Sequence, residues 1–346
     1  MSFSVGIVGL PNVGKSTLFK ALTKKEVKIA PRPFTTITPN LGMVSVPDER
    51  LNKLAEIIKP QKLTPTVIEF VDIAGLVKGA HKGEGLGNQF LAQIRNCDAI
   101  LEVIRAFENP EVENVLGETN PQKEIEVLKV ELLMKDLESL EKIIEKLGKK
   151  NPLAGGKDNL QKIEVFQKIK EGVSQGKLIS EIQLSDKEKL KIKEYQFLTT
   201  KPTLFILNSN SKDESFQIKQ KHLLINLREE EEITELSMAD RKELGLESNL
   251  DSLVKACYDI LNLITFFTVA GGKETRAWTI TKGSNALEAA KAVHSDFKEK
   301  FIRAEAVNWE KLVLAGSWSK AREKGQISII GKDYLIKDGD VIEFKI

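Results

Sequence analysis

The chain has 346 residues, of which 41% are hydrophobic and 29% are charged, so we expect a globular protein with two or three domains. Lysine and arginine total 52 against 50 aspartates and glutamates, and the net charge of +2 does not indicate a general nucleic-acid-binding protein. No apolar stretch approaches the roughly 18 residues that span a bilayer, and the N-terminus lacks a signal-peptide pattern. We therefore expect a cytoplasmic protein without membrane or DNA partners, in which Cys97 and Cys257 are reduced.

Short apolar segments separated by helical stretches follow one another from the N-terminus. The expected strands are residues 3–8, 41–46, 67–71, 99–104, 203–207 and 223–225. A glycine-rich turn follows the first strand, and a helix is expected over residues 16–23. This order predicts an α/β fold with a doubly wound, mainly parallel sheet covered by helices on both faces.

Residues 121–197 interrupt this alternation. Apolar residues there recur at steps of three and four, at Val130, Leu133, Leu137, Leu140, Ile144 and Leu147. This spacing is typical of one seam of a coiled coil. Residues 160–173 predict a return helix, and residues 151–158, with one proline and two glycines, predict the turn. We expect an inserted antiparallel helical coiled-coil hairpin, with ordinary helices covering the sheet as the alternative.

Residues 265–346 predict a third, smaller unit. Strands are expected at 277–281, 327–330, 334–336 and 341–346, and a helix at 286–301. Strands around one helix in about 80 residues indicate a small α+β domain.

The turn after the first strand carries the strongest functional signal. Gly9, Gly14, Lys15 and Ser16 satisfy the pattern G-x-x-x-x-G-K-[ST] between a strand and a helix, which predicts a P-loop. The glycines let backbone N–H groups turn inward around phosphates, and the helix N-terminus adds its positive end. Lys15 supplies a charge to the β/γ oxygens, and the Ser16 hydroxyl is a natural Mg²⁺ ligand.

A second element follows the third strand. Asp72 ends that strand and fits the carboxylate that holds Mg²⁺ directly or through water, while Gly75 lets its N–H approach the γ-phosphate. Between the P-loop and the second strand, Thr36, rather than Thr35, is expected to complete the Mg²⁺ shell. A plain polar loop is the alternative for this segment.

Residues 79–87 contain four glycines, as a movable γ-phosphate sensor requires. His81 is a candidate for influencing the attacking water, and an exposed loop histidine is the alternative. Leu76 stands where many Ras-like switches carry a water-orienting glutamine, so basal hydrolysis is expected to be slow.

Base recognition is expected after the fifth strand. A guanine-specific switch would show Asn-Lys-x-Asp there, but Asn208 is followed by Ser209, Asn210 and Ser211. No carboxylate stands at the fourth position, and Asp213 comes two residues late. Since the Asn208 amide suits the adenine edge, this favours ATP, or relaxed choice, over GTP.

Residues 9–17, 33–40, 72–90 and 266–280 resemble the YchF/Obg-like ATPases, a branch of the Obg-related P-loop switch proteins. The resemblance covers essentially the whole chain. It implies a nucleotide-binding domain at 1–120 and 198–264, the coiled-coil insert at 121–197, and a TGS domain of β-grasp form at 265–346. It also implies a preference for ATP and association with ribosomes or ribosomal RNA.

Position by position, the resemblance implies a set of nucleotide contacts. They are Asn12, Val13, Gly14, Lys15, Ser16 and Thr17, with Asn208 and Ser209 at the base, and with Ser16 and Thr36 as Mg²⁺ ligands. Ser211 replaces the family's usual acid, and Asn226 and Leu227 replace its small Ser-Ala pair, so purine selectivity is expected to be looser. Some related switches place an asparagine at the position of Asn12 to help bind K⁺ beside the phosphates.

We therefore expect a monomeric, Mg²⁺-dependent ATPase that acts as a slow, ribosome-associated switch. Its catalytic candidates are Lys15, Thr36, Gly75 and His81. A GTPase of the Obg type is one alternative, and a nucleotide-gated RNA or ribosome adaptor with incidental turnover is another. Residues 265–346 hold 14 basic against 11 acidic side chains, so ribosome association depends on the resemblance alone.

Overall fold

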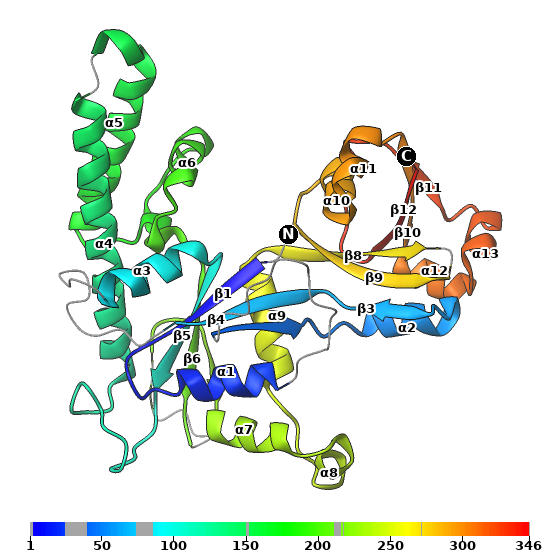
Figure 1. Cartoon of the computed structure of the whole chain (residues 1–346), viewed down its shortest axis with the longest axis horizontal. Helices are drawn as coiled ribbons and strands as arrows, with labels where there is room; N and C mark the ends of the chain where they lie inside the picture. Colours follow the sequence, from blue (N-terminus) through cyan, green and yellow to red (C-terminus); the bar gives the residue numbers. More distant parts are fainter. Residues whose placement is uncertain are drawn as a thin grey trace.

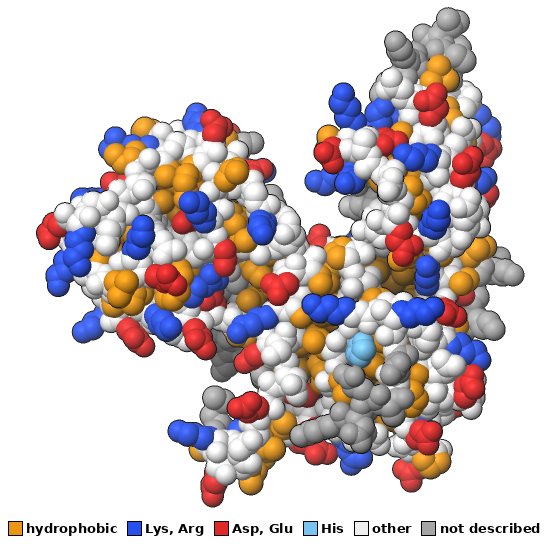
Figure 2. All heavy atoms as spheres, turned by 180° about the vertical axis from the view of Figure 1, so that it is seen from behind, with side chains coloured by type: hydrophobic (Ala, Val, Ile, Leu, Met, Phe, Trp, Pro, Cys, Tyr) orange, Lys and Arg blue, Asp and Glu red, His pale blue; other side chains and the backbone are white. Residues whose placement is uncertain are grey.

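The computed structural model describes residues 3–24, 40–73, 86–149, 152–210, 216, 218–270 and 272–345. Figure 1 shows an α/β body, a long helical arm that stands on it, and a C-terminal unit beside the arm. The space-filling view in Figure 2 shows the molecule hollowed between the arm and the C-terminal unit. None of the helices in the described part of the chain is both long and apolar enough to cross a membrane.

The body is built on a mainly parallel sheet of six strands. They are β1 (Phe3–Val8), β2 (Leu41–Ser45), β4 (Val67–Asp72), β5 (Ala99–Arg105), β6 (Thr203–Asn208) and β7 (His222–Ile225). Their order is β2-β4-β1-β5-β6-β7, and only β2 runs antiparallel to its neighbour. All seven residues of the central strand β5 are buried, as expected where helices cover both faces. The six strands and the α/β class predicted from the sequence are confirmed.

Helices cover this sheet and complete its core. They are α1 (Lys15–Thr23), α3 (Leu86–Asn96), α7 (Leu227–Glu235), α8 (Met238–Glu243) and α9 (Leu250–Ile260). The first packs on β1, β2 and β4 and contacts α7, whereas α9 packs on β5 and β6. Ile7, Leu18 and Phe70 are fully buried in the shared core, so the N-terminal half of α1 is held firmly against the sheet.

The arm is an antiparallel pair of helices, α4 (Pro121–Lys149) and α5 (Pro152–Ser174) (Figure 1). Leu133, Leu140 and Leu147 of the predicted seam are buried against Phe166 and Ile169, which confirms the inserted hairpin. Val130, however, is 53% exposed, so its assignment to the seam was wrong. Near the body, α4 turns other residues inward, because there it packs on the sheet instead of on α5.

The predicted turn at residues 151–158 was also wrong, because the structure is helical from Pro152 onward. Proline favours the first position of a helix, where its missing N–H costs nothing. Each interior glycine costs a helix only about 1 kcal/mol relative to alanine, so two glycines do not exclude a helix. The chain then returns through η2 (Ile179–Glu181), α6 (Asp186–Ile192), η3 (Lys193–Tyr195) and η4 (Leu198–Thr200).

A second sheet forms the C-terminal unit. Its strands are β8 (Leu263–Ala270), β9 (Glu274–Thr281), β10 (Arg303–Asn308), β11 (Ser328–Ile330) and β12 (Asp340–Lys345), with β3 (Lys62–Thr64) at one edge. The helices are α10 (Ala286–Val293), α11 (Ser295–Lys300), α12 (Trp309–Ala315) and α13 (Trp318–Glu323). The parallel pairing of β8 with β12, flanked by antiparallel strands and crossed by α10, is the β-grasp arrangement expected from the resemblance.

Three details of this unit differ from the sequence predictions. The helix predicted over 286–301 breaks at His294, whose backbone is extended and whose Nδ1 accepts a bond from the Asp296 amide, starting a new helix. The strand predicted at 334–336 is reduced to a single bridge between Asn285 and Leu335. No strand was predicted at the positions of β8 and β10.

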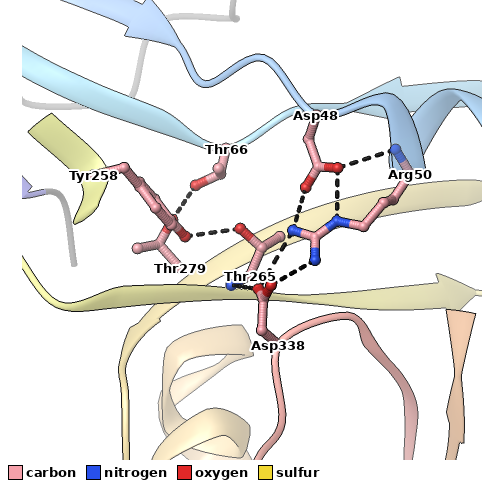
Figure 3. A network of polar contacts seen from close by, with 7 residues as sticks. All are labelled: Asp48, Arg50, Thr66, Tyr258, Thr265, Thr279 and Asp338. Carbon is pink, nitrogen blue, oxygen red and sulfur yellow. Dashed lines mark hydrogen bonds and ion pairs between the residues drawn. The ribbon is translucent and has the colours of Figure 1, made fainter. Parts of the chain in front are cut away.

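One segment of the N-terminal part belongs structurally to the second sheet. Strand β3 pairs in parallel with β9, and α2 (Glu49–Ile58) buries Leu51 and Leu54 in the same cluster as Phe267 and Val341. Polar contacts reinforce this junction (Figure 3). The Arg50 guanidinium lies between Asp48 and Asp338, and the Tyr258 hydroxyl contacts those of Thr265 and Thr279. Thr66 also hydrogen-bonds Thr279.

Candidate functional site

The backbone between β1 and α1 forms the loop that the sequence pattern predicts. Gly9 has φ 151° and Gly14 has φ 107°, which are values that favour glycine. A Cβ on Gly9 would lie 2.3 Å from the Val103 carbonyl oxygen, and one on Gly14 would lie 2.6 Å from Asn208 Nδ2. Asn12 adopts φ 63°, and asparagine is among the few other residues that tolerate this region. Both conformation and space therefore require the two glycines.

The first turn of α1 is open to an anion. No side chain caps this helix at Gly14, so its leading N–H groups have no side-chain acceptor there. The Lys15 side chain is buried, and its Nζ donates to the Leu10 carbonyl at 2.7 Å, across the loop. Burial lowers the pKa of Lys15, although the charges of Asp72 and Glu124 oppose that shift. A phosphate group held here would face one ammonium and a row of amides.

Ser16 and Asp72 bring two oxygen donors together at the edge of this loop. The Ser16 hydroxyl lies 3.3 Å from Asp72 Oδ2, so residues 56 positions apart meet as predicted. Burial raises the pKa of Asp72, while the Ser16 hydrogen bond and the charge of Lys15 lower it. A hydroxyl and a carboxylate fit Mg²⁺, which prefers oxygen ligands. Thr35, Thr36, Gly75, Leu76 and His81 lie outside the described residues.

Asn208 ties the two ends of the site together. Its Nδ2 donates to the Val13 carbonyl at 2.9 Å, and its Oδ1 accepts from the Leu227 amide at 3.1 Å. The sequence interpretation gave this amide to the purine edge, but in the structure both polar atoms bond the main chain. Its first role is therefore to fix the P-loop to the start of α7. Ser209 is buried, and its amide donates to the Ile225 carbonyl at 3.1 Å.

A cavity of about 610 Å³ extends from the P-loop past Asn208. From the loop and α1 it is lined by Asn12, Gly14, Lys15, Ser16 and Thr17. The opposite walls are Phe107, Glu108, Asn109 and Val112 after β5, Asn210 after β6, and Asn226, Leu227, Arg228 and Glu231 at the start of α7. Sequence reasoning missed the wall after β5. The sequence did contain a signal for it, because this segment follows the carboxyl end of a strand, and parallel sheets bind their ligands at the carboxyl ends of the strands.

Buried charges lie directly behind this wall. Arg105 ends β5, and Glu124 from the first turn of α4 accepts a bond from its amide at 3.1 Å. Burial raises the pKa of Glu124 to about 7, although the Arg105 amide bond and the charges of Arg105 and Lys15 lower it. Burial also raises the pKa of Glu102 well above its usual range, and the nearby Glu124 adds to this. The root of the helical arm is thus electrostatically linked to the P-loop lysine.

Comparisons with known proteins agree with this architecture. Residues 4–148 match a family model described as "50S ribosome-binding GTPase". Residues 263–346 match the model YchF-GTPase_C, described as "Protein of unknown function (DUF933)".

Full-length relatives are also similar to the chain. The "Ribosome-binding ATPase YchF" of Escherichia coli O157:H7 is 45% identical over 361 residues, with 99% of each chain covered. The protein of the same name from Bacillus subtilis (strain 168) is 43% identical, covering 100% of this chain and 99% of the relative. The solved Schizosaccharomyces pombe YchF GTPase is 32% identical, with a TM-score of 0.86 over 99% of this chain and 98% of that one. With this identity over the whole length, and with the same fold, the chain belongs to the YchF family.

Proposed function

We propose that this chain is a Mg²⁺-dependent ATPase that hydrolyses ATP to ADP and phosphate and acts as a slow switch on ribosomes. The observation that carries this proposal is the joining of a complete phosphate loop to a nucleoside-sized cavity. Lys15 and Ser16 line this cavity together with Phe107 and Leu227, and Asp72 Oδ2 lies 3.3 Å from the Ser16 hydroxyl. Relatives that are 45% and 43% identical over essentially the whole chain bear the name "Ribosome-binding ATPase YchF", which supports both the activity and the partner.

The chain's residues divide the work along this cavity. The amides of residues 12–17 and the Lys15 ammonium hold the β- and γ-phosphates, and Ser16, Asp72 and Thr36 hold Mg²⁺. When bound, Mg²⁺ neutralises charge that develops on the phosphate oxygens. The Gly75 amide contacts the γ-phosphate, and His81 influences the attacking water. Because Leu76 cannot orient that water, basal turnover is slow and rises when a partner supplies the missing group.

We further propose a division of labour among the parts. Residues 1–120 and 198–264 bind nucleotide, residues 121–197 form the coiled-coil arm, and residues 265–346 form the TGS domain. The protein acts as a monomer in the cytoplasm, with the ribosome rather than DNA as its nucleic-acid partner. Asn12 lines the cavity and stands at the position where some related switches use an asparagine to help bind K⁺, so hydrolysis should be faster in K⁺ than in Na⁺ at equal ionic strength.

A side-by-side titration with non-hydrolysable ATP and GTP analogues in Mg²⁺ tests the assignment. Tenfold tighter binding of the ATP analogue, about 1.4 kcal/mol, would support an ATPase. Phosphate release should then increase when purified ribosomes are added. Nucleotide binding without any phosphate release, with or without ribosomes, would favour the adaptor alternative and remove the enzymatic proposal.

A GTPase is the second candidate, and one residue of the cavity wall favours it. Glu108 lines the cavity beside Phe107, and a carboxylate is what guanine requires for its N1–H and 2-amino group. The solved relative from S. pombe is titled a GTPase. If GTP binds more tightly, a Glu108→Gln variant should lose that preference, whereas an ATPase should be little affected by the change.

A further inference from the structure

The end of strand β5 carries a buried guanidinium with an unusual set of partners. Arg105 is only 3% exposed. Its Nε donates to the Phe107 carbonyl at 3.1 Å, and its Nη2 donates to the Asn109 carbonyl at 3.1 Å. Its Nη1 reaches the Val112 and Glu113 carbonyls at 3.0 and 3.3 Å. One side chain therefore satisfies four backbone acceptors of a single loop.

That loop has no regular structure of its own. Residues 106–120 contain neither helix nor strand between β5 and α4. Backbone carbonyls that point into the protein need hydrogen-bond donors. In this loop the Arg105 guanidinium provides the donors that backbone N–H groups would provide in a helix or sheet. Four residues of this loop, Phe107, Glu108, Asn109 and Val112, line the cavity that begins at the P-loop. The shape of this cavity wall thus depends on where Arg105 holds its carbonyls.

Two further contacts fix the wall relative to the rest of the site. The Arg105 guanidinium carbon lies 4.5 Å from the centre of the Phe107 ring, which orients the largest side chain of the wall. Asn12 Nδ2 donates to the Glu113 carbonyl at 3.3 Å, so the P-loop shares an acceptor with Arg105. A planar fork with five donors can meet four carbonyls at once, and a lysine ammonium cannot do so in this geometry.

We propose that Arg105 is a positioning residue for nucleoside recognition, which shapes the base-facing wall at residues 107–113 without itself contacting the phosphates. The inference rests on the proposed function, because it requires that this cavity binds a nucleotide. It predicts a division of effects. Loss of the fork loosens the wall that meets the base and ribose, while the P-loop, built by the glycines and Asn208, still holds the phosphates.

Calorimetric titration of an Arg105→Lys variant with two probes tests this division. One probe is the ATP analogue β,γ-imido-ATP, and the other is Mg²⁺–tripolyphosphate, which lacks base and ribose. We expect the Kd for the analogue to rise at least tenfold and the Kd for tripolyphosphate to change less than twofold. The ratio of Kd values for ATP and CTP analogues should move toward one. An Arg105→Gln variant, which also removes the buried charge, should show the same nucleoside-specific loss.

A matched control and the contrary outcomes make the test decisive. Arg95→Lys changes a guanidinium that donates to Ser139 Oγ of α4 at 3.1 Å and does not line the cavity, so it should alter neither Kd. Equal losses for both probes, or no loss for either in a folded Arg105 variant, would overturn the inference. If folded wild-type protein bound neither probe, the proposed function would be the part that fails. A Phe107→Leu change added to Arg105→Lys should cause little further loss, since both act through the same wall.

Discussion

Replacing Arg50 with alanine should destabilise the C-terminal unit, because this side chain joins α2 to the loop before β12. Arg50 Nε and Nη2 each donate to Asp48 at 2.8 Å, and Nη1 donates to Asp338 at 2.7 Å (Figure 3). The guanidinium carbon also lies 5.5 Å from the centre of the Phe267 ring. Arg50 and Asp338 are 288 positions apart in the sequence, so their bond ties α2 to the C-terminal part of the second sheet.

The contacts differ in how much they contribute. The side chains of Arg50 and Asp48 are 24% and 9% exposed, so this ion pair is largely desolvated. Removing Arg50 leaves the largely buried Asp48 carboxylate short of hydrogen-bond partners, which lowers the free energy of unfolding by about 2 kcal/mol. Asp338 is 51% exposed, and such a pair contributes about 0.5 kcal/mol. The ring contact contributes about 0.5 kcal/mol more. Arg50→Ala should therefore cost about 3 kcal/mol, and Asp338→Asn less than about 1 kcal/mol.

Tryptophan fluorescence during urea unfolding measures this directly. All three tryptophans, Trp278, Trp309 and Trp318, belong to the C-terminal unit, so the signal reports the sheet that Arg50 supports. With a slope of about 2 kcal/mol per molar urea, a loss of about 3 kcal/mol lowers the midpoint by about 1.5 M.

Arg322→Ala is the matched control, because Arg322 pairs with Glu305 within the same unit but is 58% exposed. It should cost less than about 1 kcal/mol. If Arg50→Ala cost no more than Arg322→Ala, the junction would not depend on this network and the reasoning would be refuted. A double-mutant cycle with Asp338→Asn should isolate a coupling near the lower end of the range for contacting residues, about 0.5 kcal/mol.

Gly14→Ala should abolish nucleotide binding, because the new Cβ would lie 2.6 Å from Asn208 Nδ2 and the backbone there has φ 107°. In the same titration Gly148→Ala should bind normally, because nothing lies within 4 Å of a Cβ at that position. Asn208→Ala should weaken ATP and GTP analogues by a similar factor, roughly tenfold, because it removes two bonds to the main chain; a selective loss of ATP binding would restore its role at the purine edge. The raised pKa of Glu124, about 7 against 4.5, means that the folded state keeps a proton that the unfolded state releases. The contribution of Glu124 to stability should then fall by about 3 kcal/mol as pH rises from about 4.5 to about 7, and this contribution should stay level at higher pH. Glu124→Gln should flatten that part of the pH profile of urea unfolding, and an unchanged profile would contradict the assignment.

The phosphate loop illustrates what local sequence determines well. A strand, two glycines at fixed spacing and a helix start specify the backbone of residues 9–16 from short-range geometry alone. The alternation of apolar segments likewise predicted the six strands of the body. A strand in a sheet that is covered on both faces has apolar residues on both sides, so it stands in the sequence as a continuous apolar segment. The seam of the arm was predictable for Leu133, Leu140 and Leu147, where α4 meets only α5.

The failures share a different cause, which is that the partner of a segment lies far away in the chain. Val130 continues the seam in sequence but lies where α4 packs on the body, so periodicity could not show its exposure. Strand β3 is three residues long and exists because β9, more than 200 positions later, supplies its ladder.

The roles of Asn208 and Arg105 were also decided only by tertiary structure. The sequence identified Asn208 as a base-side residue, but its bonds to Val13 and Leu227 depend on how three loops converge. Arg105 ends an apolar strand and belongs to no motif, and the role proposed for it depends on the four carbonyls that the following loop turns toward it. Sequence by itself determined which chemistry this protein carries, since that chemistry is local in the chain. The tertiary structure decided which side chains shape the site around it, because their hydrogen-bond partners are set by the folded backbone and not by spacing.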